Sequence, residues 1–351
     1  MQPVNTHKRR IMLFGHGDDY YRSSAERLVN YSSNVWYGAE IEPLKEYMLA
    51  SVDRITRYPE PDAGSLRRML AEVHQIDPSC LLVTNGSITA FYLIAQAYSQ
   101  ARSMILVPSF AEYEDACRLY KHTLTFFFNQ RNLSELDLSQ QDFCWICNPN
   151  NPDGQLISRE DLLTLIRQNR QTTFVIDQVY ADFYPGHLLD LKDIEANPNL
   201  LIVQSISKLH KIPGMRIGYL AASEEMIRRI STYLIPWSVN ALAIEVGKYI
   251  LQHPEQFVLP LEQWLGETRR LQECIRTLGI ESYPSAVTFF LNRLPEGKKA
   301  SSLKDYLLQE KQILIRDASN FRSLDERYFR LSTQRPEENE MLLDAIRDWF
   351  K

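Results

Sequence analysis

Three ionisable side chains in the middle of the chain stand close to short apolar stretches and could do covalent chemistry together. Asp177 comes directly after the apolar residues 173–176, Lys208 follows the stretch 200–203, and Arg216 lies eight residues beyond Lys208. A lysine in such a place can form an imine with an aldehyde, an aspartate can keep a pyridine nitrogen protonated, and an arginine can bind a phosphate. These residue types in this order favour a phosphorylated aromatic aldehyde as cofactor.

Polar groups that could bind the phosphate of such an aldehyde lie in two segments. Ser205 and Ser207 stand on the same stretch as the lysine and could support Arg216 with charge-assisted hydrogen bonds. The backbone amides of Ser87 and Ile88 open a predicted helix directly after a predicted strand, and the N-terminus of a helix attracts anions. We therefore expect one phosphate site that is assembled from both segments.

The ring of the aldehyde has its own candidate partners. Asn151, in the loop 148–154, and Tyr180 could donate hydrogen bonds to the phenolic oxygen of the ring. Phe110 follows a predicted strand and could stack on the face of the ring. Asp177 would hold the ring nitrogen protonated, so that the ring can accept electrons from a bond that breaks on the substrate.

Each of these residues also has an ordinary structural explanation. Asp177 could simply cap a helix, Phe110 alone would be a core residue, and an isolated Lys208 would be a solvated surface lysine. Lys211 competes with Lys208 as the nucleophile, but it lies in a turn that approaches Pro213, so Lys208 is favoured. The functional interpretation depends on the whole set occurring in one order at the ends of strands.

The elements that must position these side chains alternate between strand and helix from position 80 to position 222. The continuous apolar stretches 143–147, 173–176 and 200–203 are typical of strands buried on both faces of a parallel sheet. A helical pattern over 158–168 separates the first two of them. The alternation predicts an α/β fold with helices packed on a mostly parallel sheet. The candidate residues, Arg216 included, would then lie at the C-terminal ends of parallel strands, where such sheets bind ligands.

The chain changes character after position 226. Helical periodicity dominates to position 278, and several strand candidates then precede a final helix over 336–350. This order predicts a second, smaller α+β domain. We expect residues 40–250 to form the large, cofactor-binding domain, and residues 1–39 together with 251–351 to form the small one. An amphipathic helix is expected over 41–55, ahead of the α/β core.

Composition and charge exclude several classes of protein. The 351 residues are 44% apolar and 24% charged, which is typical of a globular chain with a large core. The net charge of −5 argues against a nucleic-acid partner, because a surface that binds nucleic acid is basic. No segment reaches the roughly 18 uncharged apolar residues of a membrane span, so no membrane association is expected.

The cysteines and the short motifs narrow the chemistry further. Five cysteines, an odd number in a long chain, indicate a reducing, cytoplasmic setting rather than a disulfide framework. Cys144 and Cys147 spell C-x-x-C, but they lie on a predicted strand, where residues three apart point to opposite faces. No metal site is therefore expected. The glycine-rich fingerprints of nicotinamide-binding and P-loop proteins do not occur in the sequence.

The complete series of candidate residues resembles the fold-type I, pyridoxal phosphate-dependent aminotransferase superfamily over nearly the whole chain. The residues that fall on the cofactor motif of that superfamily are Asn151, Asp177, Tyr180, Lys208 and Arg216. The resemblance implies pyridoxal phosphate as the cofactor, with the lysine as the residue that holds it covalently. It also implies the mostly parallel sheet and the smaller domain described above.

Two residues match positions of that superfamily outside the cofactor motif. Arg330, in Tyr-Phe-Arg-Leu-Ser, matches the arginine that binds the substrate α-carboxylate, and Asn151 would assist it. Tyr58, in Arg-Tyr-Pro, matches a tyrosine that reaches the cofactor phosphate of the neighbouring subunit. This second match implies a homodimer with shared active sites.

Within the superfamily, the flanks of the chain resemble the threonine-phosphate decarboxylases of cobalamin synthesis. The residues 16–18 are similar to the H-G-G of that family, 30–34 to its F-S-S-N, and 314–321 to its L-I-R-D-x-x-N-F. The resemblance implies a phosphorylated amino acid as substrate, O-phospho-L-threonine, and (R)-1-aminopropan-2-ol O-phosphate as product. The candidates for binding the substrate phosphate are His16, Gly17 and Asn34.

Two other functions stay open at this point. Histidinol-phosphate aminotransferases share the core and the Arg-Tyr-Pro-Glu segment at 57–60, and would use 2-oxoglutarate as co-substrate. The other is a non-catalytic binding protein on the same fold, against which the intact set of cofactor residues argues. Asp153 replaces a threonine that is common in the family, and Gln334 stands in a tail usually written R-V-A-V-R. Both are expected near the cofactor or the substrate.

Overall fold

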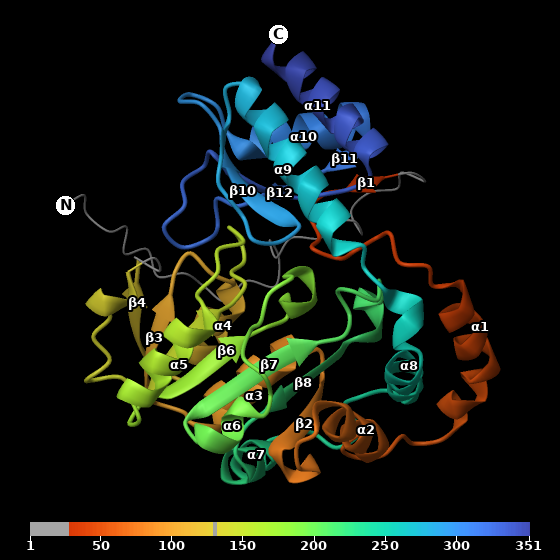
Figure 1. Cartoon of the computed structure of the whole chain (residues 1–351), viewed down its shortest axis with the longest axis vertical. Coiled ribbons are helices and arrows are strands. Elements are labelled where there is room, and N and C mark those ends of the chain that lie inside the picture. Colours follow the sequence, from red (N-terminus) through yellow and green to blue (C-terminus); the bar gives the residue numbers. More distant parts are fainter. Residues whose placement is uncertain (1–27, 129–131) are drawn as a thin grey trace.

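The structure is a computed structural model that describes residues 28–128 and 132–351. The candidates His16 and Gly17 therefore lie outside the described residues. Figure 1 shows the described chain in two halves, with a large sheet and its helices in one half and two smaller sheets with three long helices in the other.

Seven strands of the described chain form the large sheet, in the order β2-β8-β7-β6-β5-β3-β4. Their bounds are β2 Leu81–Asn85, β3 Arg102–Leu106, β4 Thr123–Phe127, β5 Phe143–Cys147, β6 Thr173–Asp177, β7 Leu200–Ser205 and β8 Ile217–Ala221. Strands β3 to β7 pair in parallel, whereas β8 lies antiparallel between β2 and β7. The expected α/β fold with a mostly parallel sheet is confirmed.

Helices cover both faces of this sheet and bury a separate apolar core on each face. The helices that contribute to one core are α1 Glu42–Ala50, α2 Gly64–His74, α5 Arg159–Gln168, α6 Asp193–Ala196 and α8 Ala241–Gln252. Those of the other core are α3 Ser87–Ala97, α4 Ala111–Leu119 and α7 Glu224–Ser231. On β5, Cys144 belongs to the first core and Cys147 to the second, so their sulfurs lie on opposite faces, as alternation along a strand predicts.

The second half of the molecule contains two smaller sheets of the described chain. A four-stranded antiparallel sheet has the order β12-β13-β10-β9, and β1 pairs in parallel with β11. The strands are β1 Val29–Asn30, β9 Glu281–Ser282, β10 Phe289–Arg293, β11 Ile313–Leu314, β12 Arg316–Asp317 and β13 Tyr328–Ser332. The helices are α9 Leu261–Thr277, α10 Ala300–Lys311 and α11 Pro336–Phe350. The β1–β11 pair joins the two ends of the chain, while the domain boundaries expected from the sequence stay a prediction.

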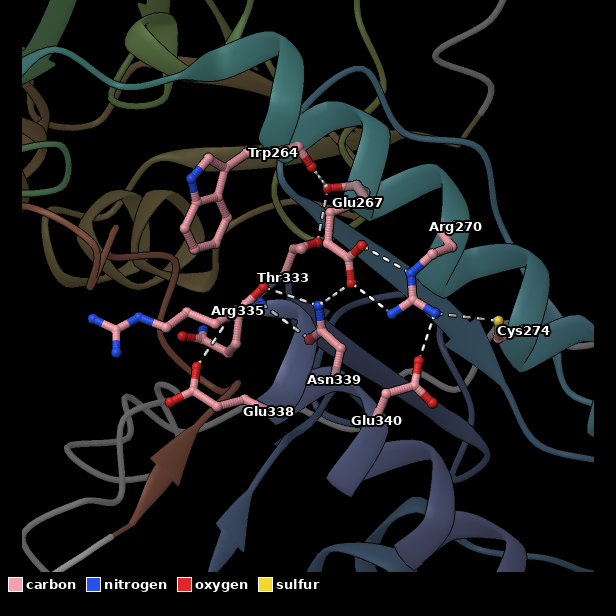
Figure 2. Close-up of polar contacts among 11 residues, drawn as sticks. Trp264, Glu267, Arg270, Cys274, Thr333, Arg335, Glu338, Asn339 and Glu340 are labelled. Carbon is pink, nitrogen blue, oxygen red and sulfur yellow. Dashed lines mark hydrogen bonds and ion pairs between the residues drawn. The ribbon is translucent and has the colours of Figure 1, made fainter.

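A polar network ties α9 to α11 and to the end of β13, as Figure 2 shows. Glu267 of α9 accepts hydrogen bonds from Arg270 at 2.7 Å and from Asn339 of α11, also at 2.7 Å. The hydroxyl of Thr333, just after β13, lies 2.8 Å from that of Thr268. These bonds fix the strand β13 against the helices behind it, and that strand carries Arg330.

One sequence-based expectation about strand direction is wrong. Arg216 was expected at the C-terminal end of a parallel strand, but it directly precedes β8, which runs antiparallel to its neighbours. It therefore stands at the N-terminal end of its strand. Because an antiparallel strand begins at the edge where its parallel neighbours end, Arg216 still reaches the same side of the sheet as Asp177 and Ser205.

Among the described residues, no helix is both long and apolar enough to cross a membrane. The five cysteines are all free thiols. The cytoplasmic setting expected from the cysteine count stays a prediction.

Candidate active site

A cavity of about 170 Å³ opens between the large sheet and β13, at the edge where the parallel strands end. Of the site residues predicted from the sequence that fall in the described chain, all but Tyr58 line this cavity. They are Asn34, Ser87, Ile88, Phe110, Asn151, Asp177, Tyr180, Ser205, Ser207, Lys208, Arg216 and Arg330. The tertiary structure thus brings together residues that lie as far apart as 34 and 330 in the sequence.

Asp177 is a buried acid, the last residue of β6, with only 4% of its surface exposed. Its Oδ1 accepts a hydrogen bond from the backbone N–H of Val179 at 2.9 Å, and its Oδ2 accepts one from the Tyr113 hydroxyl. Burial raises the pKa of Asp177 from 3.8 to about 6, although both hydrogen bonds and the charge of Lys208 lower it. A cationic ring nitrogen placed against this carboxylate would offset the cost of burying its charge.

Lys208 lies on the wall of the same cavity, in the turn that follows β7. Its backbone carbonyl accepts a hydrogen bond from the N–H of Trp36 at 3.0 Å, which fixes the turn against the segment before α1. Lys211, the competing nucleophile, has a left-handed backbone with φ of 55° and is not among the residues that line the cavity. The geometry therefore favours Lys208 as the amine that reacts with an aldehyde.

The phosphate end of the cavity is formed where α3 begins beside β8. The first N–H groups of a helix have no partner within the helix, and Ser87 and Ile88 present theirs to the cavity. A Cβ added at Gly86, whose φ is 77°, would stand 2.3 Å from the Arg216 guanidinium. A Cβ added at Gly218 would stand 2.3 Å from the Ser87 nitrogen. The two glycines therefore let an arginine and a helix N-terminus converge on one anion.

The hydroxyls of the serine pair after β7 complete this end of the cavity. The Oγ atoms of Ser205 and Ser207 lie 2.8 Å apart, and Ser205 donates to the carbonyl of Ile217 at 3.1 Å. Burial lowers the pKa of Arg216, whose Nη1 donates to the carbonyl of Pro213 at 3.1 Å. An anion at this place would restore the charge balance around the half-buried guanidinium.

Arg330 closes the cavity from the side of the small sheet. It is 5% exposed, and its two Nη groups donate to the Asn151 side-chain oxygen and to the carbonyl of Ser32. Burial lowers the pKa of Arg330 to about 10. Among the described residues no carboxylate pairs with this guanidinium, so it can bind a carboxylate of a ligand.

Tyr180 and Asn34 stand on the wall between these two cationic ends. Burial raises the pKa of the Tyr180 hydroxyl, and its ring packs edge to face on Phe289 with centroids 4.7 Å apart. Both polar side-chain atoms of Asn34 are buried, and the side chain lies close enough to the Tyr180 hydroxyl to lower the pKa of that hydroxyl. A buried amide on the wall of the cavity is suited to contact a polar ligand.

Sequence reasoning missed two groups of residues around the cavity. Tyr113 of α4 supports Asp177, and it follows Phe110 by three residues, a spacing that could have revealed it on a helix. Arg316 and Asn320 line a small recess that also borders Phe110 and Arg330, and Arg316 Nη2 donates to Asn320 Oδ1 at 2.8 Å. Their segment, residues 314–321, resembles the L-I-R-D-x-x-N-F motif described above, and this resemblance was a signal that Arg316 and Asn320 belong to the site.

Three residues lie away from the cavity. Tyr58 is 85% exposed and packs on Trp237 with ring centroids 5.2 Å apart. Asp153 accepts a hydrogen bond from Asn150 at 2.7 Å, and Gln334 donates to the carbonyl of Asn30 at 3.1 Å. Neither residue borders the cavity: Asp153 bonds within its own loop, and Gln334 bonds to the backbone of β1 and β13. The expectation that both lie near the cofactor or substrate stays a prediction.

The residues fit pyridoxal phosphate at three points. The lysine lines the same cavity as an anion site, made of a helix N-terminus with an arginine, and as a buried acid suited to a ring nitrogen. Phe110, whose ring lies 5.9 Å from that of Tyr113, borders the same space and offers a face for stacking. The glycines at 86 and 218 let Arg216 and the start of α3 approach the phosphate end closely, where a Cβ would meet one or the other.

Comparison with known proteins gives the family. The sequence model of the family Aminotransferase class I and II matches residues 26–346. A crystal structure of L-threonine-O-3-phosphate decarboxylase from Porphyromonas gingivalis is 46% identical, with a TM-score of 0.90, and covers 92% of this chain and 99% of that one. Threonine-phosphate decarboxylase from Salmonella typhimurium is 29% identical over 93% of this chain and 92% of its own length.

A relative with a different activity also matches over most of its length. Histidinol-phosphate aminotransferase from Ruminiclostridium cellulolyticum is 27% identical over 86% of both chains. The likeness to both kinds of enzyme agrees with the lysine, aspartate and arginine around one cavity. The chain is a pyridoxal phosphate-dependent enzyme and belongs to the aminotransferase class I and II family.

Proposed function

We propose that the chain decarboxylates O-phospho-L-threonine to (R)-1-aminopropan-2-ol O-phosphate, a reaction of cobalamin synthesis. The observation that carries this proposal is a second buried arginine beside the first. Arg316 is 6% exposed and borders a recess shared with Arg330 and Asn151. A substrate with both a carboxylate and a phosphate needs two cationic groups in addition to the one that holds the cofactor phosphate.

The carboxylate of the substrate is assigned to Arg330. Its guanidinium already contacts Asn151, and a bidentate arginine-carboxylate pair fixes direction as well as position. Arg330 would hold the carboxylate in one direction relative to a bound cofactor, and this direction would select which bond of the substrate reacts.

The phosphate of the substrate is assigned to Arg316, with Asn34 and Asn320 as neutral donors. Asn320 already accepts a hydrogen bond from Arg316, and Asn34 offers a buried amide on the wall of the cavity. His16 and Gly17, the other candidates from the sequence, remain proposals for the same group. Grouping the donors on one side of the cavity separates the two anions of the substrate.

The residues at the base of the cavity supply the electrostatics. When bound, pyridoxal phosphate draws the electron pair of the breaking bond into its ring. Asp177 keeps the ring nitrogen protonated, Tyr180 and Asn151 donate to the ring oxygen, and Phe110 covers the ring face. Lys208 holds the cofactor and then exchanges protons at the substrate carbon.

The direct test is product analysis with O-phospho-L-threonine. We expect release of carbon dioxide and formation of the amino-alcohol phosphate without any 2-oxo acid. Lys208→Ala should lose both turnover and the visible absorbance of the lysine-bound cofactor, while Lys211→Ala should keep both. Transfer of the amino group to a 2-oxo acid without gas release would contradict the decarboxylase. Full turnover by Lys208→Ala would move the nucleophile elsewhere.

The alternative function is transamination of histidinol phosphate with 2-oxoglutarate. The 27% identity with a histidinol-phosphate aminotransferase supports it, and 2-oxoglutarate would use the same Arg330. Histidinol phosphate has no carboxylate at its amine carbon, so Arg330 would serve only one of the two half-reactions. A half-reaction that depends on 2-oxoglutarate would therefore favour this alternative.

We also propose a homodimer in which Tyr58 reaches the cofactor phosphate of the other subunit. Tyr58 is too exposed to serve its own cavity, and it stands on a surface with other exposed apolar side chains. The exposed side chains of the amphipathic segment before Tyr58 also support a dimer. Val52 is 42% and Ile55 64% exposed, whereas Leu44 of the same segment is buried. An apolar face left in solvent is suited to a second copy of the chain.

A further inference from the structure

A buried ion pair connects the two halves of the molecule. Glu114 of α4 is 3% exposed and accepts hydrogen bonds from two arginines. Arg322, which follows β12 in the other half, donates its Nε to one carboxylate oxygen at 2.9 Å and its Nη2 to the other at 2.7 Å. Arg118, four residues along the same helix, donates its Nε at 2.8 Å. The two guanidinium groups lower the pKa of Glu114 although burial alone raises it.

Arg322 has a second contact with the large sheet. Its guanidinium carbon lies 4.0 Å from the centre of the Phe126 ring on β4. The side chain of Arg322 is 19% exposed and lies between the Glu114 carboxylate and the Phe126 ring. Both of these neighbours belong to the half of the molecule that carries the cofactor residues. A bidentate ion pair that is so little exposed to solvent has a defined geometry, whereas an exposed ion pair does not.

The segment that Arg322 anchors is the one that carries the proposed phosphate donors. Arg316, Asn320 and Phe321 come just before it and border the recess beside Arg330. The guanidinium carbon of Arg316 lies 5.3 Å from the centre of the Phe321 ring. A shift of Arg322 would therefore move the segment 316–322 relative to the cavity.

The helix that receives Arg322 carries the ring contacts of the cofactor. Phe110 caps the start of α4, Tyr113 donates to Asp177, and Glu114 is the next residue. Glu114 follows Phe110 by four residues, which places the two on one side of the helix. One helix thus holds Phe110 at its start, the support of Asp177 and the anchor for the segment 316–322.

We propose that Glu114 and Arg322 form a positioning pair that sets the distance between the cofactor face and the substrate-phosphate donors. The inference rests on the proposed function for the assignment of Arg316 to the substrate phosphate. Glu114 and Arg322 touch neither cofactor nor substrate. The pair acts through the placement of Arg316, so its loss weakens the binding of a phosphorylated substrate more than it slows the reaction of the bound substrate.

The test compares two arginines that share one carboxylate. Arg322→Met removes the link between the halves, while Arg118→Met removes a single hydrogen bond to the same carboxylate that lies wholly within α4. In each variant the carboxylate of Glu114 keeps one guanidinium, so neither variant leaves a buried charge without a partner. We expect Arg322→Met to raise the KM for O-phospho-L-threonine about tenfold with kcat within about threefold of wild type. Arg118→Met should leave KM within about twofold, and Arg322→Lys should recover part of the loss.

Two further measurements separate positioning from simple stability. The visible absorbance and the affinity for pyridoxal phosphate should stay unchanged in Arg322→Met, because the cofactor contacts remain. Amide hydrogen exchange should speed up in the segment 316–322 in Arg322→Met but not in Arg118→Met. Equal KM values for the two methionine variants, or unchanged exchange in 316–322, would overturn the proposal.

The exchange experiment also keeps this proposal separate from the proposed function. If wild-type protein does not decarboxylate O-phospho-L-threonine, the substrate assignment fails. Faster exchange confined to 316–322 in Arg322→Met would then still support the positioning pair, and slow exchange in both variants would overturn it.

Discussion

At the scale of single residues, the site depends on charges that the fold buries without full compensation. Asp177 and Arg330 face one cavity, and burial shifts the pKa of each toward its neutral form. Each has polar neighbours, Tyr113 for the acid and Asn151 for the guanidinium, which hold its direction. A cofactor and a substrate with complementary charges recover part of the cost of burial, which is a physical reason for tight binding.

Tyr113→Phe tests the support of the acid. Removing the hydroxyl removes a hydrogen bond that lowers the pKa of Asp177, so this pKa should rise from about 6 by roughly one unit. Carbon-13 NMR of the Asp177 carboxyl in cofactor-free protein measures the shift directly.

Tyr92→Phe is the matched control for this experiment. The Tyr92 hydroxyl donates at 2.8 Å to Glu112, which lies on the same helix α4 as Tyr113. The variant removes a phenol-carboxylate bond without touching Asp177, so the titration of Asp177 should stay as in wild type. A pKa of Asp177 that moves equally in both variants, or in neither, would show that the Tyr113 bond does not set it.

At the scale of elements, the anion site depends on how closely α3 approaches β8. Gly218→Ala adds a Cβ that would stand 2.3 Å from the Ser87 nitrogen, so the start of the helix must move away from the sheet. We expect the affinity for pyridoxal phosphate to fall at least about tenfold and the free energy of unfolding to drop by roughly 1–3 kcal/mol. Cofactor titration followed by absorbance and urea unfolding measure the two effects.

Gly214→Ala provides the comparison for that variant. Gly214 lies in the turn between the lysine and Arg216, and an added Cβ there meets nothing within 4 Å. Cofactor affinity and stability should both stay close to wild type. Equal losses in the two glycine variants would mean that the segment as a whole, and not the contact with α3, determines anion binding.

Elements were easier to predict than their directions. The alternation of apolar stretches and helical patterns located β5, β6, β7 and α11 closely, because a strand buried on both faces and an amphipathic helix have distinct local patterns. The same pattern did not reveal that β8 runs antiparallel. Strand direction depends on the pairing partner, and a short apolar strand has the same sequence pattern whether it pairs in parallel or antiparallel.

At the scale of the whole molecule, the exposed position of Tyr58 leads to a prediction about subunits. Mixing Lys208→Ala with Tyr58→Phe subunits should produce hybrid dimers in which one site has both its lysine and the tyrosine of the other subunit intact. Random mixing should then recover up to about a quarter of wild-type activity, since half of the dimers are hybrids with one complete site each.

The same experiment distinguishes the two ways in which Tyr58 could act. If Tyr58 served the cavity of its own chain, hybrid dimers would contain no complete site and the mixture would show only the residual activity of its parents. Sedimentation of each variant alone provides the check that both form dimers. A monomeric wild-type protein in that measurement would contradict the shared site outright.

The sequence by itself determined the residue types and their order: an aspartate and a lysine after successive apolar strands, an arginine eight residues beyond the lysine, and a helix N-terminus ahead of them. These features are local, so residue identity and short-range periodicity suffice to find them. Only the tertiary structure decided that Asn151 meets Arg330, that Tyr113 supports Asp177, and that Glu114 binds Arg322. Such contacts join segments far apart in the chain, and they depend on strand pairing and on packing between elements, which no local pattern encodes.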